Sequence, residues 1–166
     1  MSKSVSVLVL MICTLFCAGC GKSGGLGGLV PAKGVLKFNG QPVEGASVTF
    51  HPTGQTRSAS AITDAKGNFT AMTLNLNDGI YPGEYIVTVT KIEQRGEIRE
   101  EHPEGSRQPV IHDTREVIEH LPPEYGGKNT TGLKILIPES GEKNIEFNLT
   151  GDVDRTPKKV KDLQRR

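Results

Sequence analysis

Histidine residues are the first feature of this sequence that suggests a specific chemistry. Three of the four histidines, His102, His112 and His120, lie in the segment 91–131 together with several Asp and Glu residues. Imidazole and carboxylate groups are zinc ligands, and imidazole also suits copper. The spacings of ten and eight residues match no recognised ligand pattern, and the residue four positions before His120 is Glu116. We therefore expect solvated loop histidines, with a metal site at these three residues as the alternative.

The remaining chemistry-bearing residues form no catalytic set. No convergent nucleophile and base can be assigned from the sequence, so we expect no catalytic residue, no cofactor and no enzymatic activity. The chain has 20 basic and 19 acidic residues, for a formal charge of +1. Nucleic-acid-binding domains normally carry a strong basic excess, so we expect no nucleic-acid partner. A hydrophobic content of 35% with 20 glycines suits a small β-rich domain.

The cysteines indicate an attachment chemistry. Residues 5–16 form an apolar run too short to span a bilayer, which takes about 20 residues, but suited to a signal peptide. The following Cys17-Ala18-Gly19-Cys20 resembles the bacterial lipobox, with Cys17 where leucine is usual. This motif predicts removal of residues 1–19 and acylation of the Cys20 thiol. An ordinary secretory signal with an incidental cysteine is the alternative.

Processing at this position determines the expected location and partners. Cys13 and Cys17 would be removed, which leaves Cys20 as the only cysteine, and acylation of its thiol then allows no disulfide-linked partner. The glycine-rich residues 20–31 would then tether the domain to the membrane. We expect the bacterial cell envelope, on its periplasmic or surface face, with an envelope protein or cell-wall polymer as further partner. Gly21 replaces the aspartate that retains enterobacterial lipoproteins in the inner membrane, so outer-membrane sorting is favoured.

From residue 32 onward, apolar residues recur at every second position between Gly, Pro, Asn and Asp residues. This alternation is typical of half-buried strands, and Asn39-Gly40 and Asp64–Gly67 have the residue types of tight turns. The clearest alternating sets are Ala46, Val48 and Phe50; Tyr85, Val87 and Val89; Leu133, Ile135 and Ile137; and Ile145, Phe147 and Leu149. Seven such runs predict an all-β fold, a seven-stranded antiparallel β-sandwich over residues 32–150.

Three stretches of these runs also resemble one family. Residues 34–50 are similar to the opening G-x-V-x-x-x-G-x-P-x-x-G-A-x-V pattern of the carboxypeptidase regulatory-like domain. Thr63–Phe69 resembles the T-D-x-x-G-x-F turn of that family, and Pro82–Val89 resembles its P-G-x-Y-x-V-x-V strand. The resemblance implies the Greek-key topology of transthyretin-like, or prealbumin-like, sandwiches. It also implies a docking or supporting role, without a general ligand.

Two enzyme groups with that fold differ from this chain at their functional residues. Hydroxyisourate hydrolases end in Tyr-Arg-Gly-Ser, whereas this chain ends in Asp162-Leu163-Gln164-Arg165-Arg166. Intradiol dioxygenases bind iron through two tyrosines and two histidines. This chain has only Tyr81, Tyr85 and Tyr125, and Tyr85 lies at an inward strand position. The resemblance therefore implies no catalytic residues here.

Two segments do not follow the strand pattern. Within the long insertion 91–131, residues 93–107 are charged and poor in apolar residues, so we expect them to be mobile. Asp113–Glu116 resembles a capping box and predicts one short helix that ends at Pro122-Pro123. Residues 151–166 contain six basic and three acidic residues, and we expect a disordered basic tail.

These features predict a non-enzymatic, lipid-anchored envelope protein whose β-sandwich interacts with or supports another component. A carbohydrate- or metal-binding module that uses the insertion 91–131 is the alternative hypothesis. A hydrolase that uses the carboxylates of the insertion is the third.

Overall fold

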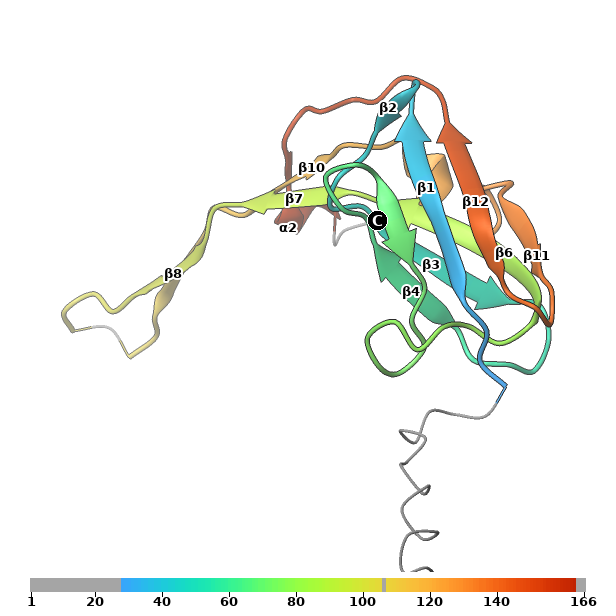
Figure 1. Cartoon of the computed structure of the whole chain (residues 1–166). Coiled ribbons are helices and arrows are strands. Elements are labelled where there is room, and N and C mark those ends of the chain that lie inside the picture. The colour runs from blue at the N-terminus through green and yellow to red at the C-terminus, as the bar shows by residue number, and fades with distance from the viewer. Residues whose placement is uncertain (1–27, 106, 164–166) are drawn as a thin grey trace, which may run out of the picture.

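A computed structural model of the chain describes residues 28–105 and 107–163, and these residues form an all-β sandwich from which one long hairpin projects (Figure 1). The first sheet contains, in spatial order, β11 (Lys134–Ile137), β6 (Gly83–Thr90), β3 (Ser47–Pro52) and β4 (Ala59–Ile62). The second sheet contains β12 (Glu142–Leu149) and β1 (Ala32–Phe38), with β2 (Gln41–Pro42) and β5 (Asn68–Thr70) paired to the other edge of β1.

The core lies between these two sheets and is centred on Phe50. The Phe50 ring lies 6.1 Å from the Phe69 ring and 6.4 Å from the Phe147 ring, both on the opposite sheet. It meets Tyr85, on its own sheet, edge to face at 6.2 Å. The alternating residues expected to point inward from three of the runs are all buried: Ala46, Val48 and Phe50; Tyr85, Val87 and Val89; and Ile145, Phe147 and Leu149. The period-2 prediction is therefore confirmed for these strands.

One strand pair departs from the antiparallel prediction. β1 and β12 are parallel, with Leu36 opposite Phe147 and Phe38 opposite Leu149, so the expectation of a wholly antiparallel sandwich is wrong for this pair. Gly34 allows the two strands to approach. A Cβ atom at that position would lie 2.3 Å from the Ile145 carbonyl oxygen and 2.7 Å from the Phe69 ring.

The turns adopt the conformations that their residues favour. Asn39 and Gly40 both have positive φ, 49° and 80°, and connect β1 to β2 as a tight hairpin. The Asp64 carboxylate accepts hydrogen bonds from the backbone N–H groups of Lys66 and Asn68, both at 2.8 Å. These hydrogen bonds lower the pKa of Asp64, the contacts with Asn68 contributing most. Both predicted turns are confirmed.

The insertion forms a β-hairpin, so the predicted short helix is wrong. Its strands are β7 (Ile92–Arg95), β8 (Ile98–Glu101), β9 (Val110–Asp113) and β10 (Glu116–Glu119), and we call residues 92–119 the arm. The Asp113 carboxylate accepts hydrogen bonds from the Arg115 guanidinium group at 2.9 Å and from the Arg115 backbone N–H at 3.0 Å. It therefore stabilises a local turn and caps no helix. The β-branched Val117 and Ile118 then pair with Gln94 and Glu93 across the hairpin.

The tail is also more ordered than expected. β13 (Lys158–Lys159) pairs with β10, and the one-turn helix α2 (Val160–Leu163) follows. The Lys158 ammonium group lies 2.9 Å from the Glu119 carboxylate. The prediction of a disordered tail is thus wrong for this part, because the edge of β10 provides backbone partners. Before β11, Pro123–Gly126 forms the 3-10 helix η2. Among the described residues, no helix has the length and apolar character needed to cross a membrane.

Candidate functional site

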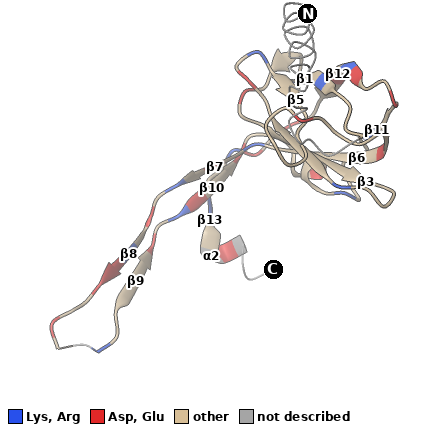
Figure 2. Cartoon of the chain, turned by 60° about the horizontal axis from the view of Figure 1, so that its bottom comes forward, with Lys and Arg blue, Asp and Glu red and all other residues tan. Residues whose placement is uncertain are grey.

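The arm contributes no side chain to the buried core cluster of the sandwich. Figure 2 shows β8 and β9 far from β1 and β5, at the end of a narrow two-stranded extension. Only the base of the arm, formed by β7 and β10, gains a third strand, because β13 covers the edge of β10. Every described residue from 97 to 112 is exposed. The distal part, residues 97–114, therefore presents both faces and both strand edges to solvent.

A bend separates the base of the arm from its distal part. Gly96 has a φ of 78°, and a Cβ atom there would lie 2.3 Å from the Thr114 carbonyl oxygen. The Thr114 N–H donates to the Glu97 carbonyl at 3.0 Å, and the Thr114 hydroxyl donates to the same oxygen at 3.0 Å. The Glu97 N–H is bound by the Thr114 hydroxyl oxygen at 3.2 Å. The Thr114 hydroxyl thus takes the place of one backbone partner between the two strands. The strands change direction at this point, where the base meets the distal part of the arm.

The distal arm has two different faces. Residues directly opposite each other in an antiparallel pair share a face, so Ile98, Glu100, Ile111 and Asp113 lie on one side. Arg99, Glu101, Val110 and His112 lie on the other. Ile98 and Ile111 are each about half exposed, at 52% and 56%, although neither has a core to cover it. One face of the distal arm thus combines two isoleucines with two acidic residues, and the other combines basic and acidic side chains with one valine.

The structure does not bring the three predicted histidines together. His102 pairs with Glu100 at 3.3 Å, and His112 pairs with Glu101 at 3.3 Å on the other face of the hairpin. The His120 imidazole lies at the base of the arm, 3.0 Å from the Glu93 carboxylate. The backbone N–H of His120 donates to the Lys91 carbonyl. No group of three or more His, Cys, Asp or Glu side chains within the described residues is arranged to hold a metal ion.

The base of the arm carries the main electrostatic contacts of the insertion. The Glu93 carboxylate accepts hydrogen bonds from Arg95 and from His120. These contacts, that of Arg95 first, hold the pKa of Glu93 below its ordinary value of 4.5. Asp113 raises the pKa of the Arg115 guanidinium group through their hydrogen bonds. Both groups are therefore ionised at neutral pH and stabilise the local geometry.

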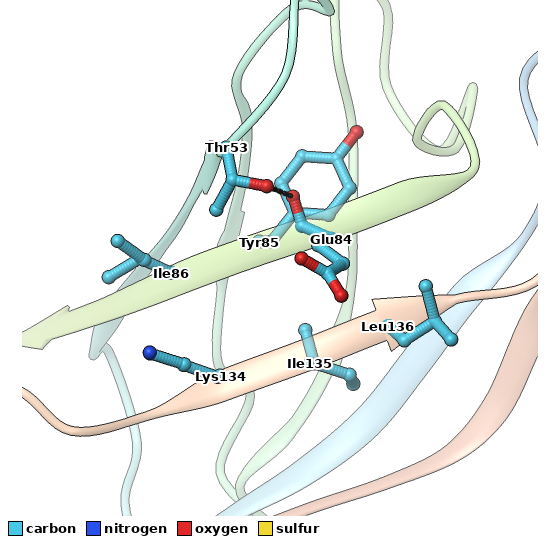
Figure 3. A pocket seen from close by; sticks show the side chains of 7 residues that line it. All are labelled: Thr53, Glu84, Tyr85, Ile86, Lys134, Ile135 and Leu136. Carbon is cyan, nitrogen blue, oxygen red and sulfur yellow. Dashed lines mark hydrogen bonds between the residues drawn. The ribbon is translucent and has the colours of Figure 1, made fainter.

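A separate shallow pocket of about 340 Å³ lies over β6 and β11 (Figure 3). Its lining residues are Thr53, Glu84, Tyr85, Ile86, Lys134, Ile135 and Leu136. The Thr53 hydroxyl donates to the Glu84 carbonyl at 3.3 Å, and the Tyr85 hydroxyl donates to the Tyr81 carbonyl at 2.8 Å. Both hydroxyl groups thus serve local structure. None of these lining residues carries an imidazole or a thiol.

Sequence reasoning missed one contact on the outer face of the first sheet. His51 lies within β3, and its Nε2 is 2.9 Å from the Thr88 hydroxyl of β6. Burial, followed by the charge of Lys128, lowers the pKa of His51, which is therefore neutral at pH 7. The period-2 pattern contained the necessary signal, because His51 is two residues after Thr49. Its neutral ring makes one hydroxyl contact and stabilises the packing of β3 on β6.

The predicted lipidation residue, Cys20, lies outside the described residues, as does most of the tether. The first described residue, Gly28, is eight positions after Cys20. An extended chain spans at most about 3.6 Å per residue, so these eight residues reach at most about 29 Å. An anchor at Cys20 would therefore hold the domain close to its bilayer.

Comparisons with known proteins do not identify a family. No family model matches the chain, and no curated protein matches it. Among solved structures, the chain is similar to a 9R-lipoxygenase from Cyanothece PCC8801, with 15% sequence identity and a TM-score of 0.33. The match covers 81% of this chain and spans about a fifth (19%) of the lipoxygenase. A TM-score of this size does not indicate a common fold. The resemblance to carboxypeptidase regulatory-like domains stays a prediction.

Proposed function

We propose that this protein is a non-enzymatic, lipid-anchored envelope module that presents its arm to another envelope component. The observation that carries the proposal is the distal arm, a two-stranded hairpin with both faces and both edges exposed. An isolated two-stranded hairpin is only marginally stable in water. Residues 97–114 thus gain little from the sandwich, and we interpret them as a recognition element.

The arm suits a partner that supplies an extended segment. The outward edges of β8 and β9 carry backbone N–H and C=O groups that no described strand pairs with. Such edges accept a further strand through main-chain hydrogen bonds, while neighbouring side chains select the partner. Between residues 92 and 119 the arm holds eight acidic residues and four arginines. An excess of negative charge favours a partner segment with basic side chains.

The anchor part of the proposal is supported by the sequence. The motif Cys17-Ala18-Gly19-Cys20 follows an apolar run of signal-peptide length and precedes a glycine-rich stretch. The envelope location and outer-membrane sorting belong to the same proposal. So does the finer fold assignment, a seven-stranded Greek-key sandwich of the transthyretin-like type, which is supported by the turn and strand motifs of residues 34–50, 63–69 and 82–89.

Two experiments test the two parts of the proposal. For the anchor, Cys20→Ala or treatment with globomycin should leave a longer precursor that lacks lipid. Unchanged processing would contradict lipidation at Cys20.

For the arm, a photo-crosslinking amino acid is placed at Ile111, and cells are irradiated. We expect one discrete adduct of higher mass at this position. The same amino acid at Ile62, which is similarly exposed on the sandwich, should not give that adduct. Identical adducts at both positions, or none at Ile111, would contradict a recognition role for the arm.

A further inference from the structure

Two leucines project from the sandwich at a site that the proposed function does not use. Leu74 and Leu76 lie in the loop between β5 and β6, and their side chains are 58% and 84% exposed. Leu76 is therefore more exposed than Ile98 or Ile111 on the arm. We call residues 73–77 the leucine loop. The two leucines are two residues apart and form a small exposed apolar patch on this loop.

The leucine loop is held in shape by one carboxylate. Asp78 accepts hydrogen bonds from the backbone N–H groups of Thr73 at 2.7 Å, Leu74 at 3.0 Å and Asn75 at 2.8 Å. The Thr73 hydroxyl donates to the Gly79 carbonyl at 2.8 Å, which closes the base of the loop. A carboxylate that binds three successive N–H groups fixes the backbone between them. The leucines are thus held outward by the loop itself.

The leucine loop is connected directly to the start of the domain. The Val30 N–H donates to the Ile80 carbonyl at 2.8 Å, and the Ile80 N–H donates to the Val30 carbonyl at 2.9 Å. Gly79 lies against the Val30 carbonyl, and Gly28 lies beside the Tyr81 ring. Figure 1 shows the loop before β6 at the same end of the sandwich as the beginning of β1. The leucines and the point where the tether enters therefore share one end of the molecule.

We propose that the leucine loop inserts Leu74 and Leu76 into the acyl boundary of the bilayer to which the chain is anchored. This inference rests on the proposed lipid anchor at Cys20. Gly28 is eight positions after Cys20, so the tether holds Gly28, at this end of the sandwich, within about 29 Å of the lipidated residue. The anchoring bilayer is therefore the apolar environment closest to the leucine loop.

This placement would also fix the orientation of the arm. Figure 2 shows β8 and β9 extending away from the part of the sandwich that carries β1 and β5. With the leucine loop in the bilayer surface, the tether and the loop form two attachment points on one end of the domain. Two attachment points restrict rotation of the domain about its tether, so the arm keeps one direction relative to the membrane instead of sweeping across it.

The test uses the mature chain beginning at Cys20, whose single thiol is coupled to a maleimide lipid in phosphatidylcholine vesicles. The chain contains no tryptophan, so Leu76→Trp introduces a unique fluorophore. We expect its emission to shift to the blue on coupling and to be quenched by brominated acyl chains. The matched control Ile111→Trp, on the arm, should keep its aqueous emission. An unchanged spectrum for L76W, or equal shifts for both variants, would overturn the proposal.

A second measurement uses the same chain with its thiol blocked and no coupled lipid. The double variant L74S/L76S should partition into vesicles about tenfold less than wild type, because it lacks the two exposed leucines. Its melting temperature should match wild type, since neither leucine is in the core. Equal partitioning would overturn the proposal. So would a wild-type dimer in the absence of vesicles that becomes monomeric in L74S/L76S, because the leucines would then contact a second copy.

These measurements are independent of the proposed cellular lipidation. Maleimide coupling replaces the cell's acylation, so the vesicle result does not depend on processing at Cys20. If the precursor test fails and L76W still inserts, the anchor assignment is wrong and the loop retains its affinity for lipid. If Cys20 is processed and L76W stays in water, the anchor stands and the loop proposal fails.

Discussion

The sandwich and the arm are built from the same secondary structure, yet they are stabilised in different ways. In the sandwich, Phe50 contacts the rings of Phe69, Tyr85 and Phe147, and strands on two sheets bury one common core. In the distal arm, the strands pair only with each other, and Ile98 and Ile111 remain half exposed. Backbone pairing is thus common to both regions, whereas burial of apolar side chains is confined to one.

Under the proposed function, this difference separates stability from recognition. A region that is stabilised by burial tolerates little change, because each core side chain touches several others. A region that is stabilised mainly by local pairing opens and reforms at low free-energy cost, which suits an element that binds another chain. Mutations should therefore act on folding in the sandwich and on binding in the arm.

The largest contrast is expected between Phe50→Ala and Ile111→Ala. Removing the Phe50 ring leaves a cavity at the centre of the aromatic cluster and should lower the free energy of unfolding by about 3–5 kcal/mol. Ile111→Ala removes an exposed side chain and should change it by about 0.5 kcal/mol or less. Urea denaturation followed by circular dichroism measures both values. Similar losses for the two variants would contradict the division between the regions.

The next effect concerns the close approach of β1 and β12. In Gly34→Ala the new methyl group meets the Ile145 carbonyl oxygen and the Phe69 ring, so the two strands must separate. We expect a loss of about 1–3 kcal/mol in the free energy of unfolding. Gly54→Ala, at a position with open space around it and, like Gly34, no positive φ, controls for the backbone cost of replacing a glycine. A loss at Gly34 no larger than that at Gly54 would contradict the steric explanation.

The sequence predicts the sandwich better than the arm, because only the sandwich buries one face of each strand. The inward residues at 46, 48 and 50, or at 145, 147 and 149, could be predicted because burial of one strand face imposes a two-residue period. In the insertion, Asp113–Glu116 has the residue types of a capping box, but the segment pairs with a strand about twenty residues earlier. Local residue types cannot reveal such a long-range partner. The leucine loop was missed for a related reason, since exposure depends on what surrounds a side chain.

A third prediction tests whether the sandwich depends on the distal arm. Arg95 and Glu116 are directly paired, so residues 96–115 can be replaced by a two-residue Asn-Gly turn that joins β7 to β10. The free energy of unfolding should change by no more than about 1 kcal/mol, because no core residue is removed. Adducts formed through the arm should disappear. Loss of cooperative unfolding in the trimmed protein would show that the arm is part of the folding unit.

The smallest effect is expected at the base of the arm, where Glu93 contacts Arg95 and His120. These contacts hold the pKa of Glu93 below 4.5, so the native state favours the ionised carboxylate more than the unfolded chain does. The stabilisation that depends on the ionised Glu93 carboxylate is present above its unfolded pKa of 4.5 and is lost as the pH falls through the lower native pKa. Because the group is exposed, the change should be confined to β7 and β10.

An NMR titration should show amides of these strands shifting below pH 4.5 before the core unfolds, and Glu93→Gln should remove that step. A Glu93 carboxyl that titrates at or above 4.5 would show that the base of the arm is held by strand pairing alone, with no contribution from its ion pairs.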